Sequence, residues 1–197
     1  MMPEAERSSV ERVRGWFQAS LEVQARLAES QAPAVARIAD LISQTFRAGG
    51  KLLLFGNGGS AADAQHVAAE FVSRFKLERR ALPAIALSTD TSILTGIGND
   101  YHFDQVFARQ VRALARPDDL AVGISTSGNS PDVLNAVVAA RECGARTVGF
   151  TGARGGRLRD LVDLCFHAPS DDTALIQQAH LAAWHAICLV VEQDLSS

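Results

Sequence analysis

Chemically active side chains are concentrated in one short segment, residues 51–71, which reads KLLLFGNGGSAADAQHVAAEF. His66 and Glu70 are four positions apart, so on a helix they lie on the same face. Such a pair can hold a divalent metal, or act as a general base with an orienting partner. The same spacing also suits an ordinary helix-stabilising pair, because a zinc site needs more ligands than two. Both interpretations remain open from spacing alone.

The C-terminal segment IQQAHLAAWHAICLVVE offers further side chains that could complete such a site: Gln177, Gln178, His180 and His185. At 100° per residue, Gln178 and His185 align best on a helix, whereas Gln177 and His185 diverge by about 80°. Both histidines have apolar neighbours, and a histidine in such surroundings is more often a core residue than a ligand. The pattern does not choose among these four residues.

Two loops have compositions suited to ligand binding. Residues 56–60 read GNGGS, where the glycines let the backbone approach a ligand and Ser60 can cap the next helix. They match neither of the common nucleotide-binding fingerprints, and a tight strand–helix turn is the alternative. Residues 125–130 read STSGNS and precede Pro131. Their hydroxyls and the free N–H groups of a helix N-terminus predict a phosphate site, with a capped serine-rich turn as the alternative.

A third loop is expected at residues 88–100, and it ends in Asn99 and Asp100. These two side chains can face the same crevice, although both residue types are also common in plain turns.

The elements that position these loops follow from five short apolar runs, which predict strands buried on both faces. The runs are residues 52–55, 84–87, 120–124, 147–150 and 164–167, and helical patterns separate or follow them at 60–75, 103–116, 131–143, 155–161 and 173–194. This alternation predicts an α/β fold with a doubly wound, mainly parallel five-stranded sheet in a three-layer sandwich. Ligands in such folds lie beyond the carboxyl ends of the strands, where the loops above fall.

Two additional N-terminal helices are expected before the first strand. One begins at Ser8 and Ser9, and the other runs from about Pro33 to the glycine pair 49–50. Their apolar stripes need a partner, and the sheet already has a helical layer on each face. We therefore expect residues 1–50 to serve in oligomerisation and 51–197 to form the core of a single domain, 1–197; packing against one end of their own domain is the alternative.

Composition narrows the class of protein. The 197 residues are 47% hydrophobic and 21% charged, with a formal charge of −3, which suits one globular domain and gives no reason to expect a nucleic acid or a membrane as partner. No apolar run reaches the length of a membrane span, and the N-terminus lacks a signal-peptide core, so we expect a cytoplasmic protein. Cys143, Cys165 and Cys188 are predicted to be buried thiols, not disulfide partners.

The order of the motifs resembles that of a known family. GNGGSAADAQHVAAEF, LSTDTS, GNDYHF, GISTSGNS, VGFTGARGG and IQQAHLAAWH are similar, over nearly the whole chain, to the sugar isomerase (SIS) domain family and, within it, to bacterial phosphoheptose isomerases. The resemblance implies a cytoplasmic, zinc-bound homotetramer. It also implies interconversion of sedoheptulose 7-phosphate and D-glycero-D-manno-heptose 7-phosphate, an aldose–ketose isomerisation through an enediol. That reaction is the first step towards activated heptose for the lipopolysaccharide core or another surface polysaccharide.

The resemblance also implies roles for particular residues. The implied zinc ligands are His66, Glu70, Gln177 and His185. For the enediol chemistry we expect Glu70 to be the base and His185 the acid. The implied substrate contacts are Asn57, Gly58, Gly59, Glu70, Asn99, Asp100, Ser125, Thr126, Ser127, Ser130 and Gln177. One departure concerns Ala174, where some relatives carry an acid: either Asp172 takes that role here or the role is dispensable.

A non-catalytic SIS protein is the alternative, one that binds the replication initiator or senses a sugar phosphate. The initiator-binding branch lacks the acid that matches Glu70 and the histidine that matches His185. This chain has both residues, which favours an enzyme because catalysis needs titratable groups in the site.

Overall fold

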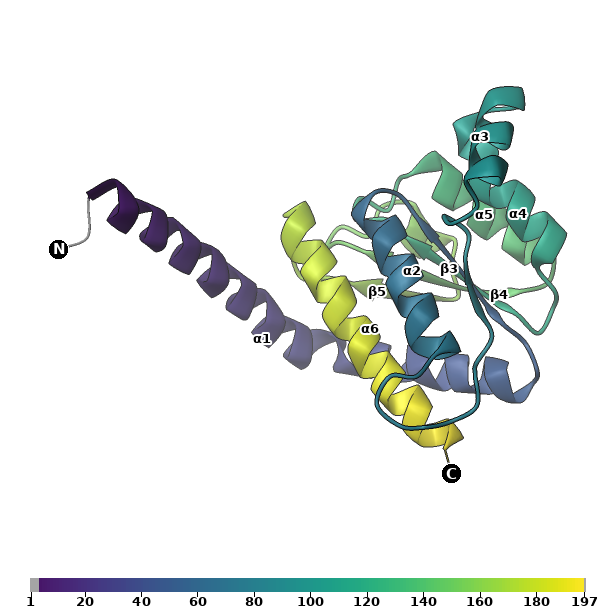
Figure 1. Cartoon of the computed structure of the whole chain (residues 1–197), viewed down its shortest axis with the longest axis horizontal. Coiled ribbons are helices and arrows are strands. Elements are labelled where there is room, and N and C mark those ends of the chain that lie inside the picture. Colours follow the sequence, from purple (N-terminus) through teal and green to yellow (C-terminus); the bar gives the residue numbers. More distant parts are fainter. Residues whose placement is uncertain (1–3, 197) are drawn as a thin grey trace.

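A parallel five-stranded sheet forms the centre of the computed structural model, which describes residues 4–196 (Figure 1). The strands are β1 (Leu52–Gly56), β2 (Ala84–Ala86), β3 (Leu120–Ile124), β4 (Arg146–Thr151) and β5 (Leu164–His167), in the order β2-β1-β3-β4-β5. Every neighbouring pair is parallel. This order confirms the predicted doubly wound fold, and each strand boundary lies within one residue of the predicted one.

Helices cover both faces of the sheet because successive strand residues point to opposite sides. Leu52 and Leu54 of β1 pack in the core beneath α2 (Gly59–Val72) and α6 (Thr173–Leu195). Leu53 and Phe55 of the same strand pack in the opposite core, beneath α4 (Val106–Leu114) and α5 (Pro131–Glu142). Strands β1 and β3 lack polar alternation because all their residues are buried, whereas Ile85 of the edge strand β2 is 39% exposed.

The N-terminal segment differs from the prediction of two helices, because it forms one continuous helix, α1 (Glu4–Arg47), with Pro33 inside it. Leu27 and Ile38 are buried on either side of the proline, so tertiary packing maintains the helix across a residue that lacks an N–H donor. Figure 1 shows the helix changing direction where it passes behind α6, and a proline is the usual cause of such a bend. Gly49, at φ 83°, ends the helix.

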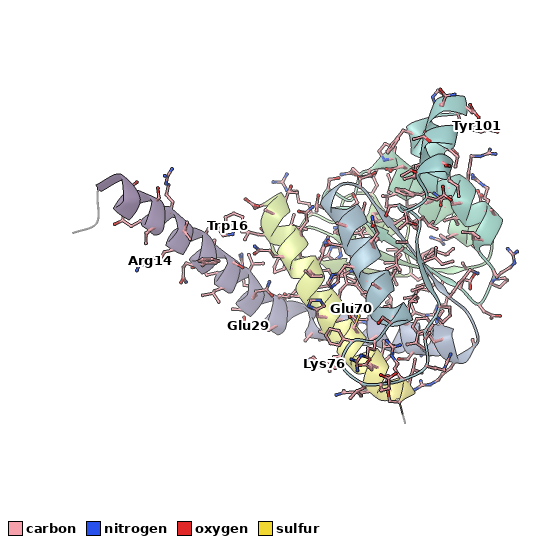
Figure 2. The ribbon with its side chains drawn as sticks, in the orientation of Figure 1. Arg14, Trp16, Glu29, Glu70, Lys76 and Tyr101 are labelled. Atoms are coloured by element: carbon pink, nitrogen blue, oxygen red, sulfur yellow. The ribbon has the colours of Figure 1, made fainter. Side chains whose placement is uncertain are left out.

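The N-terminal half of α1 extends away from the sheet, and Figure 2 shows Arg14 and Trp16 on this part. It exposes large apolar side chains on its surface: Val13, Trp16, Phe17 and Leu21. The C-terminal half packs against α6 and β5. The projecting half therefore presents an apolar stripe with no covering element among the described residues.

Residues 88–100 were expected to form a loop, but they contain the helix α3 (Thr91–Asp100). Asp90 caps it by accepting a hydrogen bond from the backbone N–H of Ile93 at 3.0 Å. No residue of this helix is fully buried, although Leu94 and Ile97 pack partly against the core, and Gly96 and Gly98 lower its helix propensity.

Two other predicted helices are shorter than expected. The pattern at 103–116 begins with a 3₁₀ turn, η1 (Phe103–Gln105), before α4. The pattern at 155–161 is only a 3₁₀ turn, η2 (Leu158–Asp160), because Gly155 and Gly156 before it adopt positive φ values that a helix cannot include.

Helix α6 is long and apolar enough to cross a membrane by length and composition, with a hydropathy of 1.4 in its most apolar window. Half of that window is buried inside the protein, and α6 packs against α1 and α2. Such burial is what a central core helix shows. All three thiols are free: Cys188 is buried as predicted, whereas Cys143 and Cys165 are only partly covered.

Candidate functional site

The site lies where the winding of the sheet changes direction, at the carboxyl ends of the adjacent strands β1 and β3. The chain leaves β1 through residues 57–58 into α2 on one face, and leaves β3 through residues 125–130 into α5 on the other. The two loops diverge from this point and leave a crevice between them, which is where doubly wound proteins bind ligands.

A cavity of about 270 Å³ occupies this crevice. Its lining consists of polar and small residues from both loops and from α6: Asn57, Gly58, Gly59, Ser60, Ile124, Ser125, Thr126, Ser130, Thr173 and Gln177. Within it, the hydroxyls of Ser125 and Ser130 are hydrogen-bonded at 2.9 Å. The structure therefore brings together seven of the eleven residues that the sequence nominated as substrate contacts.

A second cavity, of about 310 Å³, adjoins the first and shares Thr126 and Thr173 with it. Ser127 lines this second cavity, together with Arg154 and Asp171. Arg154 and Asp171 form an exposed ion pair at 3.1 Å between Nε and Oδ1. The positive charge near residues 125–130 thus comes from Arg154, which follows β4. The sequence of the loop itself contains no cation, so it could not reveal this residue.

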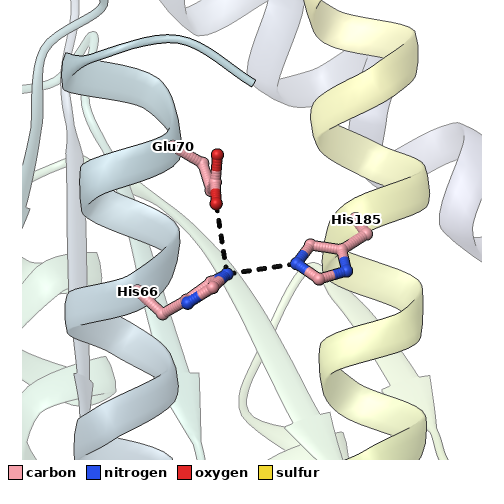
Figure 3. Close-up of side chains that lie close together, drawn as sticks. All are labelled: His66, Glu70 and His185. Atoms are coloured by element: carbon pink, nitrogen blue, oxygen red, sulfur yellow. Dashed lines mark hydrogen bonds and ion pairs between the residues drawn. The ribbon is translucent and has the colours of Figure 1, made fainter. Parts of the chain in front are cut away.

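His66, Glu70 and His185 converge between α2 and α6 (Figure 3). His66 Nε2 lies 3.2 Å from Glu70 Oε1 and 3.1 Å from His185 Nε2. One donor atom from each residue lies within 4.8 Å of the other two. Two imidazole nitrogens and a carboxylate oxygen that face a common point form a donor set suited to zinc. The residues present therefore fit a metal ion. They come from two helices, and the two histidines are 119 residues apart in the sequence.

Packing against the sheet sets the direction of this group. Val67 and Phe71 of α2 are buried in the core, so His66 and Glu70, one position earlier in each case, face α6. The ring of Phe75 stacks on that of His185, with centroids 5.5 Å apart and planes at 29°. The sequence left open which polar residues of α6 belong to the site. The surroundings of Gln177, Gln178 and His180 now distinguish them.

The Gln177 amide lies against Gly59, so closely that a Cβ on Gly59 would collide with it. Gln178 instead accepts a hydrogen bond from the hydroxyl of Ser20 on α1, at 2.7 Å. His180 is fully buried, with Nε2 3.1 Å from the carbonyl oxygen of Thr151. Desolvation lowers the pKa of His180 to about 4, despite the opposing hydrogen bond to Thr151, so this histidine is a neutral core residue.

Two nominated substrate contacts lie away from these cavities. Asn99 and Asp100 end α3, are exposed, and bind each other through Asn99 Nδ2 and Asp100 Oδ1 at 2.8 Å. Neither residue lines either cavity. Glu70 belongs to the metal-type group instead of the cavity lining, and Ser127 belongs to the adjoining cavity.

Asp172, which could substitute for the acid missing at Ala174, caps α6. Its Oδ1 accepts hydrogen bonds from the backbone N–H groups of Ala174 and Leu175 at 2.9 and 3.2 Å. The capping role accounts for this carboxylate without any part in catalysis.

Sequence reasoning missed two acids beside the site. Asp63, one turn before His66, has a carboxylate oxygen that is buried without a partner. Burial raises the pKa of Asp63, while the nearby His66 acts in the opposite direction. Asp132, just after the serine loop, is 3% exposed and accepts a hydrogen bond from Asn57. For Asp63, the sequence offered one signal, its i, i+3 spacing from His66.

The fold and its crevice define a protein of the SIS domain class, and the SIS domain family model matches residues 15–152. A phosphoheptose isomerase of Roseiflexus sp. is 61% identical over 179 residues, which are 91% of this chain and 91% of that protein. One from Aquifex aeolicus is 50% identical, over 93% of this chain and 96% of that protein.

Solved structures agree with these relatives. A phosphoheptose isomerase from Neisseria gonorrhoeae superimposes with a TM-score of 0.88 at 43% identity, covering 93% of this chain and 98% of that one. A phosphoheptose isomerase from Francisella tularensis superimposes with a TM-score of 0.91 at 36% identity, covering 94% of this chain and 98% of that one. The chain belongs to the phosphoheptose isomerase family of SIS domain proteins.

Proposed function

We propose that this chain interconverts sedoheptulose 7-phosphate and D-glycero-D-manno-heptose 7-phosphate. The observation that carries the proposal is the convergence of His66, Glu70 and His185 beside a serine-lined cavity, in a chain 61% identical to a phosphoheptose isomerase. Family membership makes it an aldose–ketose isomerase, in preference to a non-catalytic sugar-phosphate sensor or a protein that binds the replication initiator.

The phosphate group is assigned to residues 125–130. Ser125, Thr126 and Ser130 line the cavity at the N-terminus of α5, where hydroxyls and backbone N–H groups favour an anion. The open-chain sugar then extends past Asn57 and the Gly58–Gly59 turn towards α2 and α6. Gln177, which lies against Gly59, is placed to contact the sugar between its two ends.

Zinc is the metal that the donor set suits, held by His66, Glu70 and His185, with Gln177 as the fourth ligand. When bound, it would polarise the oxygens of the substrate. Glu70 takes a proton from the carbon next to the carbonyl and returns it to the neighbouring carbon. His185 moves a proton between the two oxygens as the double bond shifts. The enediol is an isomer of both sugars, so the reaction gains or loses no atom and no charge.

A homotetramer is part of the proposal. The exposed apolar stripe on the projecting half of α1 needs a partner, and a second copy of the chain supplies a matching stripe. Asn99 and Asp100 line neither cavity of their own chain. We infer that α3 of another subunit brings these two residues to the site. We also place the enzyme in the cytoplasm, where its product would supply heptose for surface polysaccharide.

The test is incubation of the purified protein with sedoheptulose 7-phosphate, with and without a chelator, followed by detection of the aldoheptose phosphate. We expect conversion that the chelator abolishes and added zinc restores. Conversion that survives full metal removal would contradict the metal assignment. An absence of conversion in every condition would reject the enzymatic proposal and favour a sensor.

A further inference from the structure

Glu192 lies on α6 two turns beyond His185, and its side chain is 1% exposed. Its carboxylate accepts three consecutive backbone N–H groups: Phe75 at 3.0 Å on Oε1, then Lys76 at 2.7 Å and Leu77 at 2.8 Å on Oε2. Burial alone would raise the pKa of Glu192, but these three donors and Arg79 lower it below its usual value. Glu192 is therefore a carboxylate that holds the segment following α2, beside the end of α6 where Figure 2 shows Lys76.

Arg79 is the cation that faces this carboxylate, and its side chain is 4% exposed. Its Nε lies 3.3 Å from Glu192 Oε1, without the alignment of a hydrogen bond. Its Nη groups donate to the carbonyl oxygens of Phe71 and Glu70, both at 2.8 Å. These carbonyls end α2, where helices leave acceptors unpaired and where a cation is favourable.

Both residues thus reach the proposed metal group through one intermediate. Arg79 binds the backbone of Glu70, whose side chain belongs to the group. Glu192 binds the backbone of Phe75, whose ring stacks on His185. A buried ion pair is seldom the most stabilising choice, because apolar residues of similar volume serve stability as well or better.

We propose that Glu192 and Arg79 are positioning residues, which fix segment 73–80 so that Phe75 orients the His185 ring and Arg79 holds the α2 backbone at Glu70. This inference rests on the proposed isomerase function for its kinetic consequences. Its structural consequences, for amide exchange and for metal retention, do not depend on any substrate.

The primary variant is Glu192→Gln, and its matched control is Asp119→Asn. Asp119 is also a buried carboxylate, 3% exposed, that pairs with a cation, Lys51, and accepts the backbone N–H groups of Lys51 and Arg116. It lies just before β3, at the end of the sheet opposite the site. Both variants remove one buried negative charge and are expected to lose similar stability.

Only Glu192→Gln should affect the site. We expect kcat to fall by about 10–100-fold with KM within about threefold, and zinc to dissociate to a competing chelator about tenfold faster, as for lost outer-shell support of metal ligands. The amides of residues 75–77 should exchange hydrogen faster. Asp119→Asn should leave kcat, zinc dissociation and these amides as in the wild type at a temperature where both variants are folded.

Two further variants keep the test decisive if Glu192→Gln folds poorly. Arg79→Lys keeps the charge but cannot reach two carbonyls with a planar fork, and it should lower kcat and speed zinc dissociation in the same direction. Phe75→Leu removes the ring on His185 but not the N–H groups bound by Glu192. It should lower kcat while the amides of Lys76 and Leu77 stay protected.

The inference would be overturned if folded Glu192→Gln or Arg79→Lys kept the wild-type kcat and the wild-type rate of zinc dissociation. It would also be overturned if Asp119→Asn changed kcat and zinc dissociation as much as Glu192→Gln does. If the wild type itself does not isomerise the sugar phosphate, the proposed function fails instead. In that case zinc dissociation and amide exchange still decide whether the pair positions the metal group.

Discussion

Asn57 donates its side-chain amide to Asp132, with Nδ2 3.1 Å from Oδ1. A carboxylate can only accept hydrogen bonds, so this contact forces the NH₂ of Asn57 towards Asp132 and leaves its carbonyl oxygen for the cavity. Asp132 itself is 3% exposed and does not line the cavity. The buried acid therefore determines which polar atom Asn57 offers to a ligand.

Asp132→Asn should relax this constraint, because an amide at position 132 can meet either end of Asn57. Loss of about 1 kcal/mol of oriented hydrogen bonding predicts an increase in KM of about fivefold, with a smaller change in kcat. Steady-state kinetics with the sugar phosphate would measure it. Asn135→Ala is the control, since Asn135 lies on the same helix but donates to the carbonyl of Asp104. A KM for Asp132→Asn equal to that of the control would reject the orienting role.

Glu70→Gln should abolish most of the isomerisation. The amide cannot accept the substrate proton, and the loss of a positioned base typically costs about 10²–10⁴-fold in rate. Initial rates and a circular dichroism spectrum would separate chemistry from folding. Glu142→Gln removes an exposed carboxylate from α5 and should keep the wild-type rate. A folded Glu70→Gln variant with a full rate would remove Glu70 from catalysis.

Gly59→Ala and Gly58→Ala should differ in effect, although the residues are adjacent. A Cβ at position 59 would collide with the Gln177 amide, whereas one at 58 has no atom within 4 Å but sits on a backbone with φ 53°. We expect Gly58→Ala to cost about 1–3 kcal/mol of stability, because its ψ of −120° places the residue outside the left-handed helical region, where a Cβ is strained. Gly59→Ala should displace Gln177 and lower kcat/KM and zinc retention by more than tenfold. Equal zinc retention in the two variants would exclude Gln177 as a ligand.

His180 should make stability depend on pH. Its folded-state pKa, about 4, lies below the unfolded value of 6.5, so the unfolded chain takes up a proton first as the pH falls. The stability is thus complete above pH 6.5 and is lost as the pH falls towards 4, by about 2 kcal/mol at pH 5. Urea unfolding at pH 7 and pH 5 would measure the free energy of unfolding at each pH. The difference between the two values should be smaller for His180→Gln than for the wild type. The exposed His102, replaced by Gln, should leave the difference unchanged.

Replacing Phe17 and Leu21 of α1 by Asp should dissociate the oligomer. Both side chains are more than 60% exposed in the single chain, and burying two carboxylates in an apolar interface is costly. Light scattering at micromolar concentration would report the mass. Arg26→Glu, on the opposite face of the helix, is the charge-changing control. A wild-type chain that is monomeric at this concentration would contradict the tetramer.

Strands were the most predictable part of the fold, because runs such as 52–55 are apolar on both faces and short. Helix α3 was missed because its apolar pattern, Leu94 and Ile97, is short and is interrupted by Gly96 and Gly98, which favour a loop. The continuity of α1 through Pro33 was also missed, because it depends on contacts of Leu27 and Ile38 with distant elements.

The His66–Glu70 half of the site was visible as a spacing on one helix, but its partner on α6 was not. Helix geometry favoured Gln178, whereas the structure turns that side chain to Ser20. The deciding information is which face of α6 the sheet covers. The buried pair Arg79–Glu192 left no local pattern either, since its members are 113 residues apart and are brought together only by packing.

The contact between α1 and α6 joins the two ends of the chain. Ser43 on α1 donates to the side chain of Asp194, and Arg47 donates to the Asp194 backbone carbonyl, across about three quarters of the sequence. Helix α6 follows α1 and all five strands in the chain, so α1 cannot complete its packing until α6 has been synthesised. His185 arrives on that last helix. A chain cut short before α6 would keep the contact of α1 with β5 but would lack the α6 cover and His185, so we expect it to lose the proposed metal site.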